Sequence, residues 1–194
     1  MRPFRYLALL VFFLDLPIPL YWFILHPLNS FWRRHMRAAF WTATLGAWVL
    51  GAVFIGLFHN KLIDAGGPSF PIALAGLVLI ASDVILLRRA GRDLGPMKLV
   101  GHAELTGKMD MITDGIYAHV RHPRYAGMIA AVAGACLLAE TRFAWITGAA
   151  WLAPVMVSIS MEEREMRSRF GAAYEDYCRR VPRFLPLRAR ARRA

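Results

Sequence analysis

Charged residues are scarce in this sequence, and acidic ones are scarcer than basic ones. Only 19% of the 194 residues are charged, with 13 Asp and Glu against 24 Lys and Arg. Cysteine occurs only at Cys136 and Cys178, on either side of a long polar stretch, so no disulfide framework is expected. Hydrophobic residues are abundant instead, at 57%, against about 45–50% in soluble domains. The composition therefore predicts one membrane domain.

Four stretches are nearly free of charge and long enough to cross a bilayer, which takes about 20 helical residues. They are residues 6–25, 38–58, 70–87 and 126–159. The last stretch has Glu140 and Arg142 near its middle, which predicts two helices joined by a very short turn. The predicted fold is an all-α integral membrane protein with five transmembrane helices, the last two forming a helical hairpin. Pro17 and Pro19 interrupt the first span and predict a kink in it.

The basic residues predict the orientation of these spans, because cytoplasmic loops are enriched in Lys and Arg. Segments 29–37, 88–124 and 160–194 contain 3, 7 and 10 basic residues, and only four of the 24 lie elsewhere. We therefore expect the N-terminus outside and the C-terminus in the cytoplasm. The net charge of +11 then reflects topology and attraction to anionic lipid. We expect membrane lipids, and no nucleic acid, as partners.

Chemistry is expected in the second half of this single membrane domain. Residues 1–87 contain three spans, 88–124 a cytoplasmic loop, 125–160 the hairpin and 161–194 a cytoplasmic C-terminal segment. Asp15 and Asp83 are acids inside predicted spans, where charge is costly. We expect Asp15 to pair with a polar group and Asp83 to pair with Arg88 or to reach the interface. His119 and His122 lack a third ligand nearby, so no metal site is expected.

The first motif, residues 110–127, leads into the fourth span. Gly115 permits a tight turn, and Pro123 suits the first turn of a helix. A helix N-terminus offers free backbone N–H groups that suit a carboxylate. Aromatic and basic side chains precede or begin this helix: Tyr117, Arg121, His122 and Tyr125. An interfacial belt explains any one of them, but the cluster indicates a binding site.

The second motif, residues 162–186, follows the fifth span. Glu162 and Glu163 lie directly at the membrane end, where carboxylates are costly unless they face water, a ligand or a basic partner. A solvated helix with pairs such as Glu163 and Arg167 is the alternative interpretation. It does not explain why carboxylates gather at the basic side of the membrane.

The order and spacing of the residues in the two motifs resemble those of a known protein family. The run Gly-Ile-Tyr-x3-Arg-His-Pro-x-Tyr-x-Gly, an apolar hairpin, and Glu-Glu-x7-Gly-x2-Tyr-x2-Tyr-x3-Val-Pro-x-Phe-x-Pro are similar to the isoprenylcysteine carboxyl methyltransferase family. Its bacterial and archaeal relatives and the phospholipid N-methyltransferases are similar more broadly. The resemblance covers about residues 98–186. It implies an integral membrane protein, which we expect in a bacterial inner membrane.

The resemblance implies a cytoplasmic S-adenosylmethionine pocket over the end of the hairpin. The residues that it assigns to the cofactor are His102, Met109, Asp110, Met111, Ile112, Tyr117, His122, Pro123, Arg124, Tyr125 and Glu162. Arg121 and Glu163 are the expected catalytic residues. A carboxylate can pair with the ammonium group of the cofactor, and Tyr or His faces suit its adenine or sulfonium.

The implied reaction is direct methyl transfer to a lipophilic or lipid-borne acceptor. Catalysis would rest mainly on positioning. Family members that act on prenylcysteine carboxylates carry an Arg four residues before the cofactor glutamate, where this chain has Ser158. An amine or thiol acceptor is therefore open beside a carboxylate. The alternatives are an NADPH-dependent sterol or steroid reductase, whose pattern Arg124 and Met128 do not fit, and a non-catalytic lipid-binding or partner-binding protein.

Overall fold

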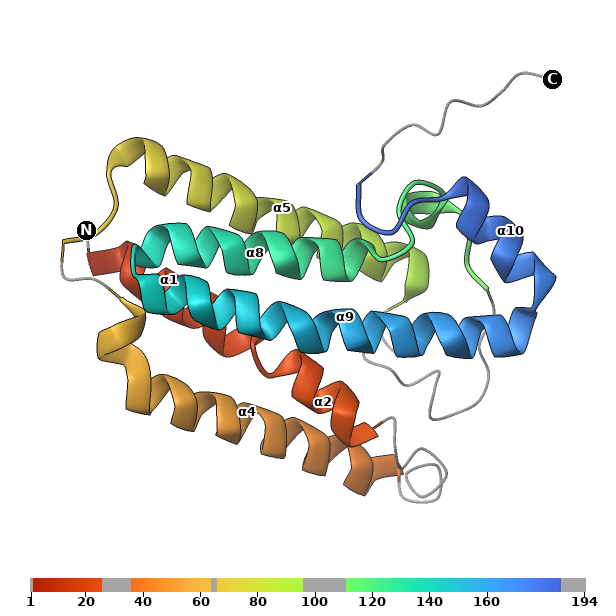
Figure 1. Cartoon of the computed structure of the whole chain (residues 1–194), viewed down its shortest axis with the longest axis horizontal. Helices are drawn as coiled ribbons and strands as arrows, with labels where there is room; N and C mark the ends of the chain where they lie inside the picture. The colour runs from red at the N-terminus through yellow and green to blue at the C-terminus, as the bar shows by residue number, and fades with distance from the viewer. Residues whose placement is uncertain (1, 26–35, 64–65, 96–110, 186–194) are drawn as a thin grey trace.

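The computed structural model describes residues 2–25, 36–63, 66–95 and 111–185. Within these residues the chain is helical and has no strand (Figure 1). The elements are α1 (Arg2–Asp15), α2 (Ile18–Leu25), α4 (Met36–Leu62), α5 (Phe70–Leu94), the 3-10 helix η1 (Gly115–Ala118), α8 (Pro123–Ala139), α9 (Arg142–Phe170) and α10 (Ala172–Arg180). The long helices run up and down beside one another, and η1 and α10 lie at the end where α5 and α9 finish. The predicted all-α class is confirmed.

Among the described residues, four helical segments are long and apolar enough to cross a membrane. They are Pro3–Phe23, Trp41–Leu62, Phe70–Leu94 and Arg142–Phe170. The fourth predicted span, α8, is apolar but has only 17 residues. At about 1.5 Å per residue it is about 26 Å long, slightly less than a hydrocarbon core of about 30 Å. Its crossing as a fifth span stays a prediction.

The first span is kinked at Pro17, as its prolines predicted. Helix α1 ends at Asp15 and α2 begins at Ile18, and Pro17 is fully buried at the junction. The kink packs closely against Gly51 of α4, where an added Cβ would lie 2.6 Å from Cγ of Pro17. A larger residue at position 51 would separate α4 from the kink.

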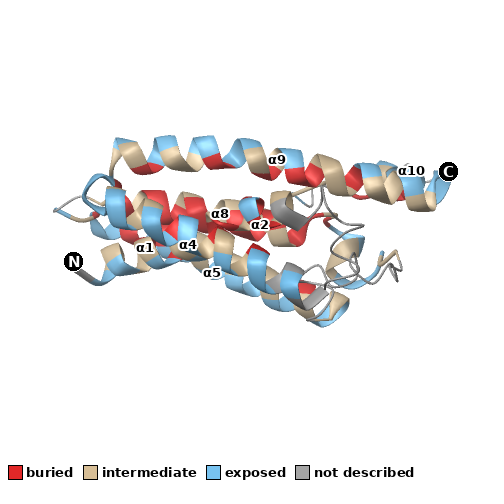
Figure 2. Ribbon diagram, turned by 90° about the horizontal axis from the view of Figure 1, so that it is seen from below, coloured by how far each residue is buried: buried red, intermediate tan, exposed pale blue. Residues whose placement is uncertain are grey.

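Helix α8 forms the centre of the bundle, and Figure 2 shows buried residues concentrated on it. The tightest contact of α8 with another helix is with α5. At this crossing a Cβ added to Gly134 would lie 2.6 Å from the backbone oxygen of Gly76. The glycines let two backbones meet because no side chain separates them. Helix α9 approaches α8 near the turn, where the Cys136 thiol contacts the backbone oxygen of Ala144 at 3.3 Å.

The predicted hairpin between α8 and α9 has a two-residue connection. Glu140 adopts a left-handed conformation with φ 53°. Thr141 caps α9, since its hydroxyl accepts a hydrogen bond from the Ala144 backbone N–H at 3.0 Å. The same hydroxyl donates to the backbone oxygen of Leu62 at 3.0 Å. The turn is thereby tied to the end of α4.

Candidate functional site

The candidate site lies where α8 begins beside the far part of α9. Pro123 is the first residue of α8 and His122 precedes it. The backbone before α8 pairs with the C-terminal segment, because Arg121 N–H donates to the oxygen of Pro182 at 2.9 Å and His122 N–H donates to that of Arg183 at 3.0 Å. Two regions about sixty residues apart in the sequence, the two motifs, therefore meet at the start of this helix.

Glu163 connects three segments of the chain at this point. Its side chain is fully buried, and Oε1 accepts hydrogen bonds from Arg121 Nη2 at 3.0 Å and His122 Nε2 at 3.1 Å. Arg183 donates to both oxygens, from Nε at 3.0 Å and from Nη2 at 2.6 Å. Charge-assisted bonds of this kind compensate for the cost of burying a carboxylate. Glu163 thus holds the entry to α8 and the C-terminal segment against α9.

Arg121 extends this connection to the end of α10. Its Nη1 donates to the backbone oxygens of Cys178 at 2.9 Å and Val181 at 2.7 Å. Carbonyls at a helix C-terminus lack intrahelical partners, so the guanidinium satisfies them. Its Nε is buried and has no hydrogen-bond partner within the described part of the chain. The two predicted catalytic residues, Arg121 and Glu163, are therefore bonded to each other.

Glu162 lies beside this cluster with a different set of neighbours. The Tyr125 hydroxyl donates to its Oε1, and His122 Nδ1 is 3.9 Å from Oε2. Its side chain is 21% exposed. Among the residues that the structure describes, no donor forms a hydrogen bond to Oε2. One carboxylate oxygen is thus fixed by tyrosine and the other is left to accept from a cationic or N–H group.

Arg124, in contrast, pairs away from Glu162. Its Nη1 donates to Asp83 Oδ1 of α5 at 2.8 Å, and its Nη2 forms an ion pair with Asp15 Oδ1 of α1 at 3.5 Å. Asp83 was expected to pair with Arg88 or to reach the interface, but Arg124 takes that place because α5 and α8 meet there. A Cβ on Gly127 would lie 2.4 Å from Asp83 Oδ1, so the close approach depends on this glycine.

Tyr117 belongs to η1 and is held by α10, since the Tyr177 hydroxyl donates to its backbone oxygen at 2.7 Å. Burial, and secondarily the nearby Tyr177 phenol, raises the pKa of Tyr117 well above its usual range. Its hydroxyl therefore stays protonated at neutral pH. Met111 packs against the buried group formed by Tyr174, Tyr177 and Val181.

The structure thus brings together most of the predicted site that it describes. Arg121, His122, Tyr125, Glu162 and Glu163 form one connected group, with Pro123 fully buried at its base. Ile112 is partly buried in the irregular segment that precedes η1. The remaining predicted cofactor residues, His102, Met109 and Asp110, lie outside the described residues.

Two contributors were missed by the sequence interpretation. Arg183 binds Glu163 from an unassigned position of the Val-Pro-x-Phe run, and the only signal was its basic side chain. Asp93 of α5 accepts a hydrogen bond from the Ile116 backbone N–H at 2.6 Å and holds η1. Gly115 was a signal for this close approach, because a Cβ there would lie 2.2 Å from Asp93 Oδ2. No group of three or more metal-ligating side chains occurs among the described residues.

Comparisons with known proteins point to methyltransferases. The family model for phospholipid methyltransferases matches residues 72–173. Protein-S-isoprenylcysteine O-methyltransferase of Schizosaccharomyces pombe is 36% identical over 92 residues, covering 40% of this chain and 33% of the relative. Methanethiol S-methyltransferase 2 of Bradyrhizobium diazoefficiens is 38% identical over 78 residues, covering 37% of this chain and 27% of the relative. The chain thus spans about a third or less of these curated relatives, and no solved structure matches it significantly.

Proposed function

The chain belongs to the phospholipid methyltransferase family, and on that basis we propose that it transfers a methyl group from S-adenosylmethionine to a lipophilic acceptor in the membrane. The matched region includes α8 and α9, most of α5, the whole first motif and residues 162–173 of the second motif. Membrane spans beside a polar site suit an acceptor that enters from the bilayer and a cofactor that enters from the aqueous side.

The observation that supports the cofactor is the arrangement at Glu162. S-adenosylmethionine carries a sulfonium and an amino-acid ammonium, and when bound it supplies the methyl group. A carboxylate with one oxygen fixed by Tyr125 and the other without a hydrogen-bond donor in the described chain is suited to accept from that ammonium. His122 and Tyr125 add aromatic faces next to it, with ring centroids 5.9 Å apart.

We propose that the other predicted cofactor residues also line the S-adenosylmethionine site, each through a different contact or position. Tyr117 and Met111 lie in the segment that α10 holds in place. Pro123 begins α8, whose N-terminus offers partial positive charge. Arg124 would contribute through its position on the first turn of α8 while its guanidinium pairs with Asp83. Ile112 and the predicted residues His102, Met109 and Asp110 are the remaining members of the proposed cofactor site.

For Arg121 and Glu163 the contacts support a positioning role in methyl transfer. Glu163 is fully buried and bonded to Arg121, His122 and Arg183. These bonds fix the ring of His122 and the entry to α8. Orientation of this kind can lower a barrier by roughly 7–11 kcal/mol in favourable systems, so a loosened cluster would slow the reaction.

We further propose that the acceptor offers a lipid amine, a thiol or a carboxylate. The named relatives act on an isoprenylcysteine and on methanethiol. Ser158 occupies the position where family members that act on prenylcysteine carboxylates carry an arginine. It is buried and donates to the Pro154 oxygen at 3.1 Å. No cation is supplied there, which favours an amine or thiol. An amine would have to lose a proton before it attacks the methyl group.

The orientation that accompanies this function has the N-terminus outside and the C-terminus in the cytoplasm. The site end of the bundle includes the basic ends of α5 and α9, as the distribution of Lys and Arg requires for an inner face. We propose that α8 crosses as a fifth span in an integral protein of a bacterial inner membrane. Its shortness is offset by burial within the bundle.

Titration calorimetry of the detergent-purified protein with S-adenosylhomocysteine, with NADPH in parallel, tests the proposal. We expect binding of the adenosyl compound and a loss of about tenfold or more in Glu162→Gln, because a hydrogen bond to a charged group is removed. Glu165→Gln, the same change three residues along α9, is the matched control and should bind as the parent. Binding of NADPH alone would favour the reductase, and equal binding by both variants would reject the role of Glu162.

A further inference from the structure

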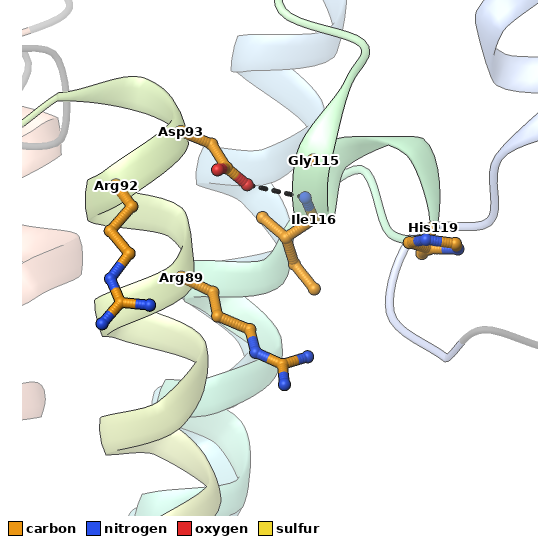
Figure 3. A pocket seen from close by; sticks show the side chains of 6 residues that line it. All are labelled: Arg89, Arg92, Asp93, Gly115, Ile116 and His119. Carbon is orange, nitrogen blue, oxygen red and sulfur yellow. Dashed lines mark hydrogen bonds between the residues drawn. The ribbon is translucent and has the colours of Figure 1, made fainter.

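A pocket lies at the end of α5, beside η1 (Figure 3). Its volume is about 290 Å³, and it is open to the outside. The lining residues are Arg89, Arg92, Asp93, Gly115, Ile116 and His119. None of them belongs to the group around Glu162 and Glu163. The pocket is therefore separate from the candidate site.

Two guanidinium groups dominate this pocket. Arg89 and Arg92 are one helical turn apart on α5. Figure 3 shows the Arg89 side chain extending beneath Ile116 toward the side of His119, whereas the Arg92 side chain runs along α5 away from Ile116 and His119. Neither arginine forms an ion pair or hydrogen bond with another described residue. The arginines of the candidate site differ, since Arg121 and Arg124 are bonded to carboxylates. The positive charge of the pocket is thus available to a ligand.

The one acidic group of the lining is already engaged. Asp93 Oδ2 accepts the Ile116 backbone N–H at 2.6 Å and fixes η1 against α5 (Figure 3). Gly115 has φ 56°, and a Cβ there would overlap the Asp93 carboxylate. The wall is therefore held in one arrangement by a backbone contact. The Asp93 carboxylate thus bonds to the Ile116 backbone N–H and not to Arg89 or Arg92.

The pocket lies at the depth of lipid headgroups in the proposed membrane. Helix α5 is apolar from Phe70 to Leu87 apart from Ser82 and Asp83, and Arg89 follows within one turn. Basic residues immediately beyond a span contact the headgroup layer and attract anionic lipid. Arginine is suited to phosphate because its planar fork can donate two parallel hydrogen bonds to phosphate oxygens. An imidazole such as His119 can add a further donor.

We propose that the pocket binds the phosphate group of a phosphate ester, with Arg89 and His119 as donors and Arg92 adding positive charge at its edge. A lipid headgroup and a soluble phosphate ester share this chemistry. Because the pocket and the group around Glu162 share no residue, the proposal goes beyond methyl transfer and does not depend on it. Occupancy would hold η1, which directly precedes the first motif's His-Pro entry to α8.

Binding assays on the purified full chain test both sources. Native mass spectrometry measures retention of phosphatidic acid against diacylglycerol, which lacks the phosphate. Calorimetry measures glycerol 3-phosphate against glycerol. The variant is the double substitution R89Q/R92Q. The matched control is R88Q/R164Q, which removes two exposed arginines of α5 and α9 that do not line the pocket.

We expect the parent and R88Q/R164Q to bind a phosphate ligand, and R89Q/R92Q to bind it about tenfold or more weakly. Retention of phosphatidic acid identifies a lipid source, and binding of glycerol 3-phosphate identifies a soluble one. Should the double variant misfold, Arg89→Gln and His119→Asn provide the same comparison, with each variant checked by thermal unfolding.

Three outcomes would overturn the phosphate site. Equal weakening in R88Q/R164Q would mean that net charge alone attracts the ligand. Equal retention of ligands with and without phosphate would mean that the pocket does not recognise it. A parallel loss of S-adenosylhomocysteine binding in R89Q/R92Q would assign the pocket to the cofactor. The last result is distinguishable from failure of the proposed function, in which the parent would not bind that compound.

Discussion

Replacing Glu163 by glutamine should destabilise the protein far more than the same replacement at a neighbouring glutamate. The amide keeps the size of the side chain but removes its charge, so Arg121 and Arg183 lose their counter-ion. Glu163 is fully buried, and the Arg121 side chain is only 10% exposed. Water therefore has little access to these two groups in the folded protein.

The magnitude follows from this burial. Removing one partner of a buried ion pair costs about 3–5 kcal/mol, but the Arg183 side chain is 39% exposed and keeps some hydration. We therefore expect about 2–4 kcal/mol for Glu163→Gln. In a chain of this length about 1 kcal/mol corresponds to roughly 2–4 °C. The expected fall in melting temperature is about 5–15 °C.

Glu165→Gln is the matched control on the same helix. Glu165 pairs with Arg169 one turn away, with side chains 25% and 23% exposed. Such a pair contributes about 0.3–0.5 kcal/mol, so its loss should lower the melting temperature by about 2 °C or less. Thermal unfolding in detergent, followed by size-exclusion chromatography with fluorescence detection, measures both variants.

Similar melting temperatures for the two variants would refute the reasoning. They would mean that water already reaches the Glu163 cluster, or that its bonds to Arg121 and Arg183 are not formed. A fall confined to Glu163→Gln, together with weaker S-adenosylhomocysteine binding, would support the proposed positioning role. Retained binding at temperatures well below melting would separate stability from that role.

Two further predictions concern packing and pH. Gly134→Ala should lower the melting temperature, because its Cβ would meet the Gly76 backbone oxygen at 2.6 Å and overpacking costs about 1–3 kcal/mol. The control is Gly56→Ala, where no atom lies within 4 Å of the added Cβ, and it should leave the melting temperature unchanged or raise it. Equal effects of the two substitutions would contradict the tight crossing of α8 and α5. Burial raises the pKa of Tyr177 from 10.0 to about 12, so the stability from its hydroxyl bond to Tyr117 is full below about pH 10 and declines as the pH rises toward 12. Alkaline unfolding of the parent and Tyr177→Phe measures this, and the variant should show a weaker dependence on pH. An unchanged profile would show that Tyr177 does not contribute to it.

Much of the fold could be predicted because its signals are local. Transfer of apolar side chains into lipid is favourable residue by residue, so the charge-free runs predicted α1, α4, α5 and α9. The charged pair Glu140 and Arg142 predicted the turn between α8 and α9. Pro17 predicted the kink, because a proline inside a helix removes a hydrogen bond and clashes with the preceding turn.

The candidate site was predicted in part, because motif order indicates which residues gather but not how they bond. His122, Tyr125 and Glu162 were assigned to one site and lie together. The alternative interpretation paired Glu163 with Arg167 of its own helix, and that ion pair is present at 3.6 Å. Arg121 and Arg183, which belong to other segments, add shorter bonds to Glu163.

The sequence alone determined where the chain is apolar, where it turns and which polar motifs lie at the same end of the bundle. Only the tertiary structure decided which charges pair, because those pairs join residues far apart in the chain. Arg124 and Asp83 are 41 residues apart, and Arg124 and Asp15 are 109 apart. Their contact depends on α8 packing against α5 and α1. That packing depends on where glycines let helix backbones approach, which is a property of two surfaces together and not of either sequence segment.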